Sequence, residues 1–128
     1  MQVKDVMTKG VEVVRPDATL EEAAKKMKSL DIGPLPVCDG EKLVGILTDR
    51  DITVRATAEG RDPKQTKVQE VMSKELIYCV EDQDVEEATK LMQSKQIRRV
   101  PILNRDKRLV GILSLGDLPW HDGWPNAW

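Results

Sequence analysis

Apolar side chains recur three and four positions apart in two stretches of the chain, residues 20–30 and residues 85–95. This spacing is typical of the buried face of an amphipathic helix. Thr19 and Asp84 directly precede the two stretches, and both residue types cap helix N-termini. The pattern therefore predicts two helices with similar ends.

Strand patterns also come in pairs. Short runs rich in β-branched residues, at 11–14 and 76–80, predict one strand ahead of each helix. Behind each helix, two apolar runs flank a turn, which predicts a hairpin. The hairpin strands are expected at residues 35–38, 43–47, 100–103 and 109–113. A final helix is expected at residues 49–59, ended by Gly60, and Pro119 cuts short its counterpart in the second half of the chain.

The two halves of the chain also align residue by residue. Residues 3–9 match residues 68–74, residues 20–27 match 85–92, and residues 43–47 match 109–113. This duplication predicts an α+β fold of two β-α-β-β-α repeats related by a pseudo-two-fold axis. We place the first repeat with the start of a linker at residues 1–62, and the second at 63–118. A tail containing all three tryptophans occupies residues 119–128. It is expected to pack irregularly on the module or on a partner, and the alternative is a disordered or artificially added end.

A strand followed at once by a helix start is the most informative local motif. Gly45-Ile46-Leu47 is apolar, and Thr48 with Asp51 three residues later has the spacing of a capping box. Free N–H groups at a helix start can hold an anion. Ser114 and Asp117 repeat the motif. From these residues alone, an anion site and a plain helix cap both remain open.

Composition narrows the function. The 128 residues carry a net charge of −2, which gives no reason to expect nucleic-acid binding. No apolar run is long enough to span a membrane, so a cytoplasmic protein is expected. Cys38 and Cys79 have no metal or redox spacing and are expected to be buried thiols, and the methionines are expected to pack in the core. The only histidine, His121, lies in the tail, so neither a histidine-based metal site nor a catalytic triad is expected in the main body. We also find no Gly-rich phosphate loop, and we expect no enzyme activity and no catalytic cofactor.

The duplicated motifs resemble those of cystathionine-β-synthase (CBS) domains in tandem, the arrangement called a Bateman module. They are a Val-Met-Thr/Ser start, an Ile-x-x-Leu/Val-Pro-Val/Ile strand and a Gly-Ile-Leu-Thr/Ser-x-x-Asp end. The segment Leu47-Thr48-Asp49-Arg50-Asp51-Ile52 further resembles stand-alone bacterial CBS pairs. The resemblance implies a non-catalytic regulatory module, commonly a homodimer, whose clefts between the repeats bind AMP, ADP, ATP or adenosyl ligands. It also allows an alternative, a ligand-free dimerisation or interaction module. The regulated protein partner is not evident.

The resemblance also implies roles for particular residues. Asp51 and Asp117 would accept hydrogen bonds from ribose hydroxyls, and Thr48 and Ser114 would bond a phosphate. The adenine edge would meet the backbone of one strand, and isoleucines would pack on its faces. The residues expected to contact a nucleotide are Val11, Glu12, Ile32, Gly33, Ile46, Thr48, Arg50, Asp51, Leu76, Ile77, Ile97, Arg98, Arg99, Ile112, Ser114 and Asp117.

The two sites are not expected to be equal. Thr48 and Asp51 have Arg50 beside them and are expected to gain Arg98, with Arg99 nearby, from the second repeat. A charge-assisted contact to phosphate contributes about 1.5–3 kcal/mol, so this site is expected to bind phosphates better. The Ser114 site, with Leu115 and Gly116 beside it, lacks such a cation. Asp49 opposes the ranking, because it adds a negative charge to the first site, and Glu12 is an unusual neighbour for a base in the second.

Overall fold

The computed structural model describes residues 1–118, which form two compact units. The first unit contains residues 12–76. The second unit contains residues 1–11 and 77–118. Each unit is mixed α and β, as the sequence predicts.

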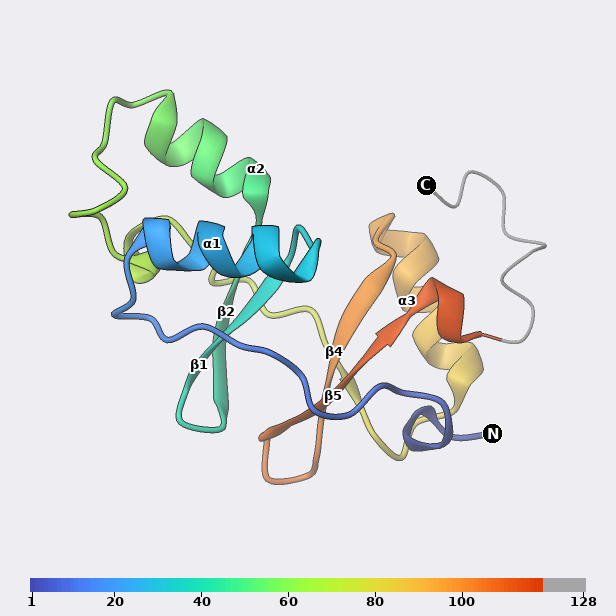
Figure 1. The fold of residues 1–128 in the computed structure, drawn as a ribbon. Coiled ribbons are helices and arrows are strands. Elements are labelled where there is room, and N and C mark those ends of the chain that lie inside the picture. Colours follow the sequence, from blue (N-terminus) through green and yellow to red (C-terminus); the bar gives the residue numbers. More distant parts are fainter. Residues whose placement is uncertain (119–128) are drawn as a thin grey trace. The chain divides into compact units, whose positions relative to one another are not determined.

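The first unit is a hairpin with a helix packed on it (Figure 1). Strands β1 and β2 are antiparallel, and a bulge falls between Val37 and Cys38. Two short segments of other helix types complete the unit. Its elements are α1 (Leu20–Leu30), β1 (Leu35–Asp39), β2 (Lys42–Leu47), α2 (Asp49–Asp51), a π-helix (Ile52–Thr57) and a 3₁₀-helix (Val68–Glu70).

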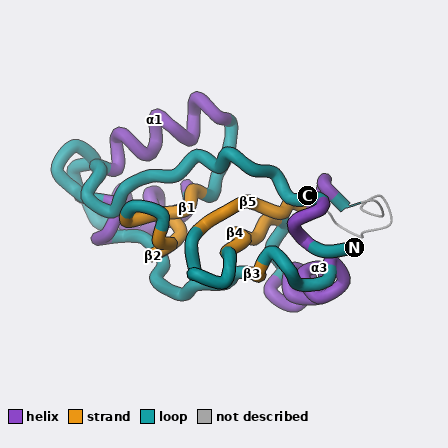
Figure 2. Tube along the Cα trace, turned by 90° about the horizontal axis from the view of Figure 1, so that it is seen from below, coloured by secondary structure: helices purple, strands orange, loops and turns teal. Residues whose placement is uncertain are grey.

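The second unit repeats this plan with one more strand. The strand order is β3-β4-β5, with β3 parallel to β4 and β4 antiparallel to β5, and Figure 2 shows the three strands in this order. Its elements are a 3₁₀-helix (Val3–Asp5), β3 (Cys79–Val80), α3 (Val85–Lys95), β4 (Arg99–Leu103), β5 (Leu109–Ser114) and a 3₁₀-helix (Leu115–Asp117).

The long helices begin and end where their caps predict. Thr19 accepts a hydrogen bond from the Glu22 N–H at 3.2 Å, and the Glu22 carboxylate accepts one from the Thr19 N–H at 3.2 Å. Asp84 caps α3 by accepting from the Glu86 N–H at 2.9 Å. Both helices end at a left-handed residue, Asp31 with φ 54° and Gln96 with φ 55°. The predicted helix bounds are confirmed.

The predicted strands at residues 11–14 and 76–80 are largely wrong. Only Val14 pairs in the first, by a single parallel bridge to Val37, and only β3 forms in the second. Proline explains the short ladders. In this register the next hydrogen bond would need an N–H from Pro36 or Pro101, and proline has none. Close to this short ladder, Lys26 Nζ donates to the Val13 carbonyl at 2.7 Å.

The core of each unit is aliphatic. Leu20, Leu35 and Leu47 are fully buried in the first unit, and Ile102 and Leu113 in the second. Met27 and Met92 fill the space under the two helices. This confirms the prediction that an apolar core with almost no aromatic residues is filled by methionine.

Both cysteines are buried free thiols, as predicted. Burial raises the pKa of the Cys38 thiol to about 11. Burial, with a smaller contribution from the charge of Glu87, raises the pKa of the Cys79 thiol to about 11. At neutral pH both side chains are therefore neutral members of the core.

The start of each sequence repeat packs on the hairpin of the other repeat. The N–H of Ile46 bonds the Ser73 carbonyl at 3.0 Å and the N–H of Ser73 returns a bond at 2.9 Å. Thr8 and Ile112 exchange two bonds of 2.9 Å in the same way. Residues 67–73 thus complete the first unit, and residues 1–8 complete the second. A unit in space is therefore not the same set of residues as a repeat in the sequence.

Two glycines make it possible for residues 67–73 and 1–8 each to pack on the hairpin of the other repeat. We call these two stretches the exchanged segments. A Cβ on Gly45 would lie 2.6 Å from Met72 Sδ and 2.9 Å from the Ser73 carbonyl oxygen. A Cβ on Gly111 would lie 2.6 Å from Met7 Sδ and 2.9 Å from the Thr8 carbonyl oxygen. Real Cβ contacts are not this short, so only glycine lets the two backbones approach.

Candidate functional site

The predicted capping box at Thr48 is confirmed. Strand β2 ends at Leu47, and Thr48 is extended, with φ −115°. The Asp51 N–H donates to Thr48 Oγ1 at 3.1 Å, and the Thr48 N–H donates to Asp51 Oδ2 at 2.9 Å. These reciprocal bonds fix the Asp51 carboxylate at the end of the strand.

The helix that follows has the predicted position but a different winding. Helix α2 spans only Asp49–Asp51 and continues as a π-helix over Ile52–Thr57 (Figure 1). Gly60 follows with φ 71°, the left-handed conformation expected of a glycine stop. A π-helical turn is uncommon and occurs often beside functional sites.

Arg55, on the π-helix, forms a long ion pair with the Asp51 carboxylate. Its Nε lies 3.9 Å from Asp51 Oδ1. Its Nη1 donates to the Val71 carbonyl at 3.2 Å and to the Met72 carbonyl at 3.4 Å. Sequence reasoning missed Arg55, although its position four residues after Asp51 puts both on one helix face.

The second motif has the same box, and up to residue 118 no long helix follows it. The Ser114 N–H and its hydroxyl both donate to Asp117 Oδ2, each at 3.0 Å. Only a single 3₁₀ turn, Leu115–Asp117, follows, and Leu118 is already extended. The predicted shortening of this helix is confirmed. An argument from a helix N-terminus therefore applies only at Thr48.

Each motif also contacts the loop that leads into its own hairpin. A Cβ built on Gly33 would lie 3.1 Å from Asp49 Oδ1. At the corresponding place in the second unit, the Leu115 N–H donates to the Arg98 carbonyl at 2.8 Å. Gly33 thus lies beside the Thr48 motif, and the backbone of Arg98 lies beside the Ser114 motif.

The predicted site residues divide equally between the units. Ile32, Ile46, Ile97 and Ile112 are half-buried, while Arg50, Arg98 and Arg99 are exposed. The contacts predicted across the two repeats stay predictions. The first unit holds Glu12, Ile32, Gly33, Ile46, Thr48, Arg50, Asp51 and Leu76, and the second holds Val11, Ile77, Ile97, Arg98, Arg99, Ile112, Ser114 and Asp117.

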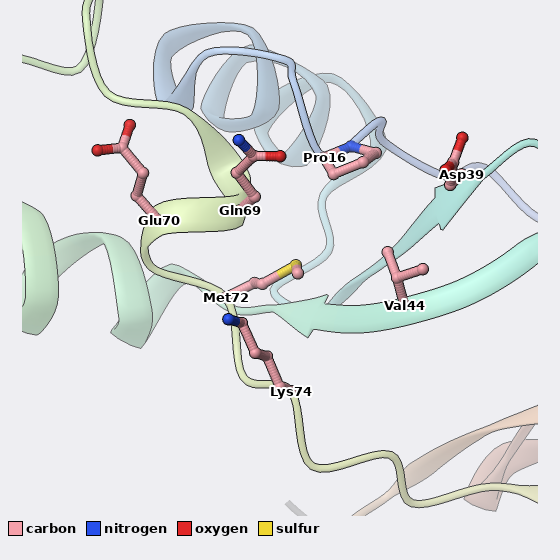
Figure 3. A pocket seen from close by; sticks show the side chains of 7 residues that line it. All are labelled: Pro16, Asp39, Val44, Gln69, Glu70, Met72 and Lys74. Carbon is pink, nitrogen blue, oxygen red and sulfur yellow. The ribbon is translucent and has the colours of Figure 1, made fainter.

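An open hollow of about 510 Å³ lies elsewhere on the first unit. Figure 3 shows Met72 reaching toward the space between Pro16 and Val44, with acidic and basic side chains around it. None of the predicted nucleotide contacts lines it. Its lining residues are Pro16, Asp39, Val44, Gln69, Glu70, Met72 and Lys74.

Within residues 1–118 there is no group of three or more His, Cys, Asp or Glu side chains that could hold a metal ion. In the same part of the chain, no helix is long and apolar enough to cross a bilayer. His121 and the tryptophan-containing tail, residues 119–128, lie outside the described residues.

Comparison with known proteins gives consistent matches over nearly the whole chain. A model of the CBS domain matches residues 3–56 and again residues 68–118. The CBS domain-containing protein YhcV of Bacillus subtilis is 50% identical over 116 residues, which cover 91% of this chain and 81% of that protein. Hypoxic response protein 1 of Mycobacterium tuberculosis is 38% identical over 119 residues, covering 92% and 82%.

Two solved structures have the same fold. A crystal structure of Hypoxic Response Protein I with two coordinated zinc ions matches with a TM-score of 0.82 and 37% identity, covering 91% of this chain and 95% of that one. The CBS domain pair of protein MJ0100, in complex with 5-methylthioadenosine and S-adenosyl-L-methionine, matches with a TM-score of 0.79 and 31% identity, covering 96% of both chains.

Proposed function

Since this chain belongs to the CBS-domain family and carries two copies of the domain, we propose that it is a regulatory module that binds an adenosine-containing ligand through its two Thr/Ser-x-x-Asp motifs. The ligands considered are AMP, ADP, ATP and adenosyl compounds. In this proposal the protein has no catalytic role. Binding would change how the module engages a partner protein.

The observation that carries the proposal is the fixed carboxylate at the end of each hairpin. Asp51 and Asp117 each accept a backbone N–H, at 2.9 Å and 3.0 Å, which leaves the remaining lone pairs of an acceptor-only group for a ligand. A ribose offers two neighbouring hydroxyl donors. A carboxylate held in one orientation suits such a pair, because its ordering cost is met on folding.

Threonine and serine would take the other end of the ligand. Thr48 already accepts the Asp51 N–H, so its hydroxyl proton remains available for a phosphate oxygen. The Ser114 hydroxyl donates to Asp117 instead, and must rotate to donate to a ligand. This difference supports a preference of the Thr48 motif for phosphorylated ligands.

Charge near the motifs supports the same ranking. Arg50 is exposed beside Thr48, whereas Leu115 and Gly116 hold the corresponding positions beside Ser114. The negative charge of Asp49 partly cancels the positive charge of Arg50. The Arg98 carbonyl accepts a hydrogen bond from the Leu115 N–H beside Ser114, so only the Arg98 side chain is left to supply the phosphate contact predicted at the Thr48 motif.

The known complex of the MJ0100 CBS pair with two adenosyl compounds is further support, since that protein shares the fold at 31% identity. We also propose that this protein is a cytoplasmic homodimer. Leu30 and Val54, which are 39% and 47% exposed on the first unit, are candidates for that contact. Light scattering coupled to size exclusion would test it.

A thermal-shift panel tests the proposed function. AMP, ADP, ATP, S-adenosylmethionine, NAD and cyclic dinucleotides are each added to the wild type and to the double variant Asp51→Ala/Asp117→Ala. We expect an adenosine compound to raise the Tm of the wild type and to leave the double variant unchanged. If none of these compounds shifts the wild type, the ligand-free dimerisation module becomes the better account.

A further inference from the structure

Arg55 has more bonding capacity than its contacts use. Its guanidinium has five N–H donors. Nη1 is bound to two carbonyls, and Nε faces Asp51 Oδ1 at 3.9 Å. Within residues 1–118 the Nη2 group donates no hydrogen bond that the structure records. The side chain as a whole is 55% exposed.

The charge of the motif makes this arginine important. Residues 48–51 contain two carboxylates, Asp49 and Asp51, and one cation, Arg50. Without Arg55 the motif is net negative, which opposes a phosphate. Arg55 offsets the charge of Asp51, whose side chain is only 15% exposed. A partly buried charge is screened less by salt than an exposed one, so its compensation matters more.

The second motif offers no such arrangement in the described residues. Asp117 is approached by the Ser114 hydroxyl, a neutral donor, and the chain leaves the helical conformation at Leu118. An arginine one helical turn beyond the aspartate therefore distinguishes the first motif from the second.

We propose that Arg55 is a specificity-determining residue of the Thr48–Asp51 motif, which makes this motif bind phosphorylated adenosine in preference to uncharged adenosine. The inference rests on the proposed function. Arg55 acts by cancelling the charge of Asp51, and its Nη2 group is placed to donate to a phosphate.

A purely structural role has a different signature. Arg55 also ties the π-helix to the Val71 and Met72 carbonyls, and losing these bonds would lower stability whatever the ligand. Such a role would weaken AMP and adenosine binding by one common factor. The ratio of the dissociation constants for adenosine and AMP therefore distinguishes a role in specificity from a purely structural role.

The test is calorimetric titration of AMP and adenosine in an Asp117→Ala background, which leaves only the first motif. Arg55→Gln removes the positive charge, and Arg55→Lys keeps the charge but loses the planar guanidinium with its several N–H donors. Arg15→Gln is the matched control, since Arg15 pairs with Asp17 at 3.0 Å on the surface of the same unit. Melting curves check that each variant is folded.

We expect Arg55→Gln to weaken AMP binding about fivefold and adenosine binding less than twofold. Arg55→Lys should keep the ratio of the adenosine and AMP dissociation constants within about twofold of the parent value even if its Tm falls. Arg15→Gln should leave the affinity for both ligands unchanged. An unchanged ratio in folded Arg55→Gln overturns the inference and leaves the proposed function standing. If Arg55→Gln does not fold, a loss of the ratio in Arg55→Lys overturns it. If the Asp117→Ala parent binds neither compound, the first motif is not an adenosine site and this inference fails, while the wild-type thermal-shift panel decides the proposed function separately.

Discussion

The Thr48 motif and the Ser114 motif begin alike and end differently. Each follows a hairpin strand, each closes a capping box on an aspartate, and each begins three residues after a buried glycine packed on a methionine. After Asp51 the chain continues as a π-helix that carries Arg55, whereas Leu118, directly after Asp117, is extended. The features that the two units share stabilise the fold. The units differ in the charge and in the hydroxyl geometry around Asp51 and Asp117.

The largest expected effect tests the apolar core that the two units share. Leu47 directly precedes Thr48, Leu113 directly precedes Ser114, and both leucines are fully buried. Leu47→Ala and Leu113→Ala should therefore each lower the unfolding free energy by about 2–5 kcal/mol. Denaturant melts measure this. A cost under about 1 kcal/mol for one of the pair would show that the two cores are not equivalent.

The exchanged segments are tested next. Gly45→Ala and Gly111→Ala each force a methyl group against a methionine sulfur and a backbone oxygen, so each should lower the unfolding free energy by about 1–3 kcal/mol. Gly116→Ala is the matched control, because nothing lies within 4 Å of the added Cβ, and it should stay within about 0.5 kcal/mol of wild type. Equal stability of all three variants would contradict the close approach.

The exchange shows where sequence reasoning ends. Helix and hairpin bounds follow from local spacing and caps, and those were predicted. The segments 3–5 and 68–70 look alike in sequence, so the pattern could not tell which hairpin each joins. The short ladders at Val14 and Cys79 were predictable in principle, because Pro36 and Pro101 lack an N–H.

The site was predicted in the same partial way. The capping boxes at Thr48 and Ser114 follow from spacing alone and are confirmed. Arg55 lies outside the four-residue motif, and its contacts to the Val71 and Met72 carbonyls depend on packing by residues 67–73, which local spacing does not reveal. The nucleotide contacts of the other predicted residues stay predictions.

A smaller effect separates the two caps. Thr48→Ala removes the acceptor for the Asp51 N–H and should cost about 1 kcal/mol, while Thr48→Ser should restore most of it. Ser114→Ala loses one hydroxyl bond to Asp117 ahead of a single turn, and should cost about 0.5 kcal/mol. Chemical denaturation of the three variants is the measurement. A larger cost at Ser114 than at Thr48 would reverse this comparison.

The thiols should show no difference between the units. Burial raises the pKa of both Cys38 and Cys79 to about 11, so neither should react with a thiol reagent at pH 8 in the folded protein. Both should react in guanidinium. Because the folded pKa exceeds the unfolded value, stability from the neutral thiols is complete below the unfolded pKa of about 9 and is lost as the pH rises toward 11. Rapid labelling of one thiol at pH 8 would show that its unit opens locally.

The most direct test of the difference between the motifs is an AMP titration of Asp51→Ala beside Asp117→Ala. The account predicts that Asp51→Ala removes the tighter AMP site, whereas Asp117→Ala leaves that site at its wild-type affinity. It would be contradicted if Asp51→Ala bound AMP as the wild type does while Asp117→Ala lost binding.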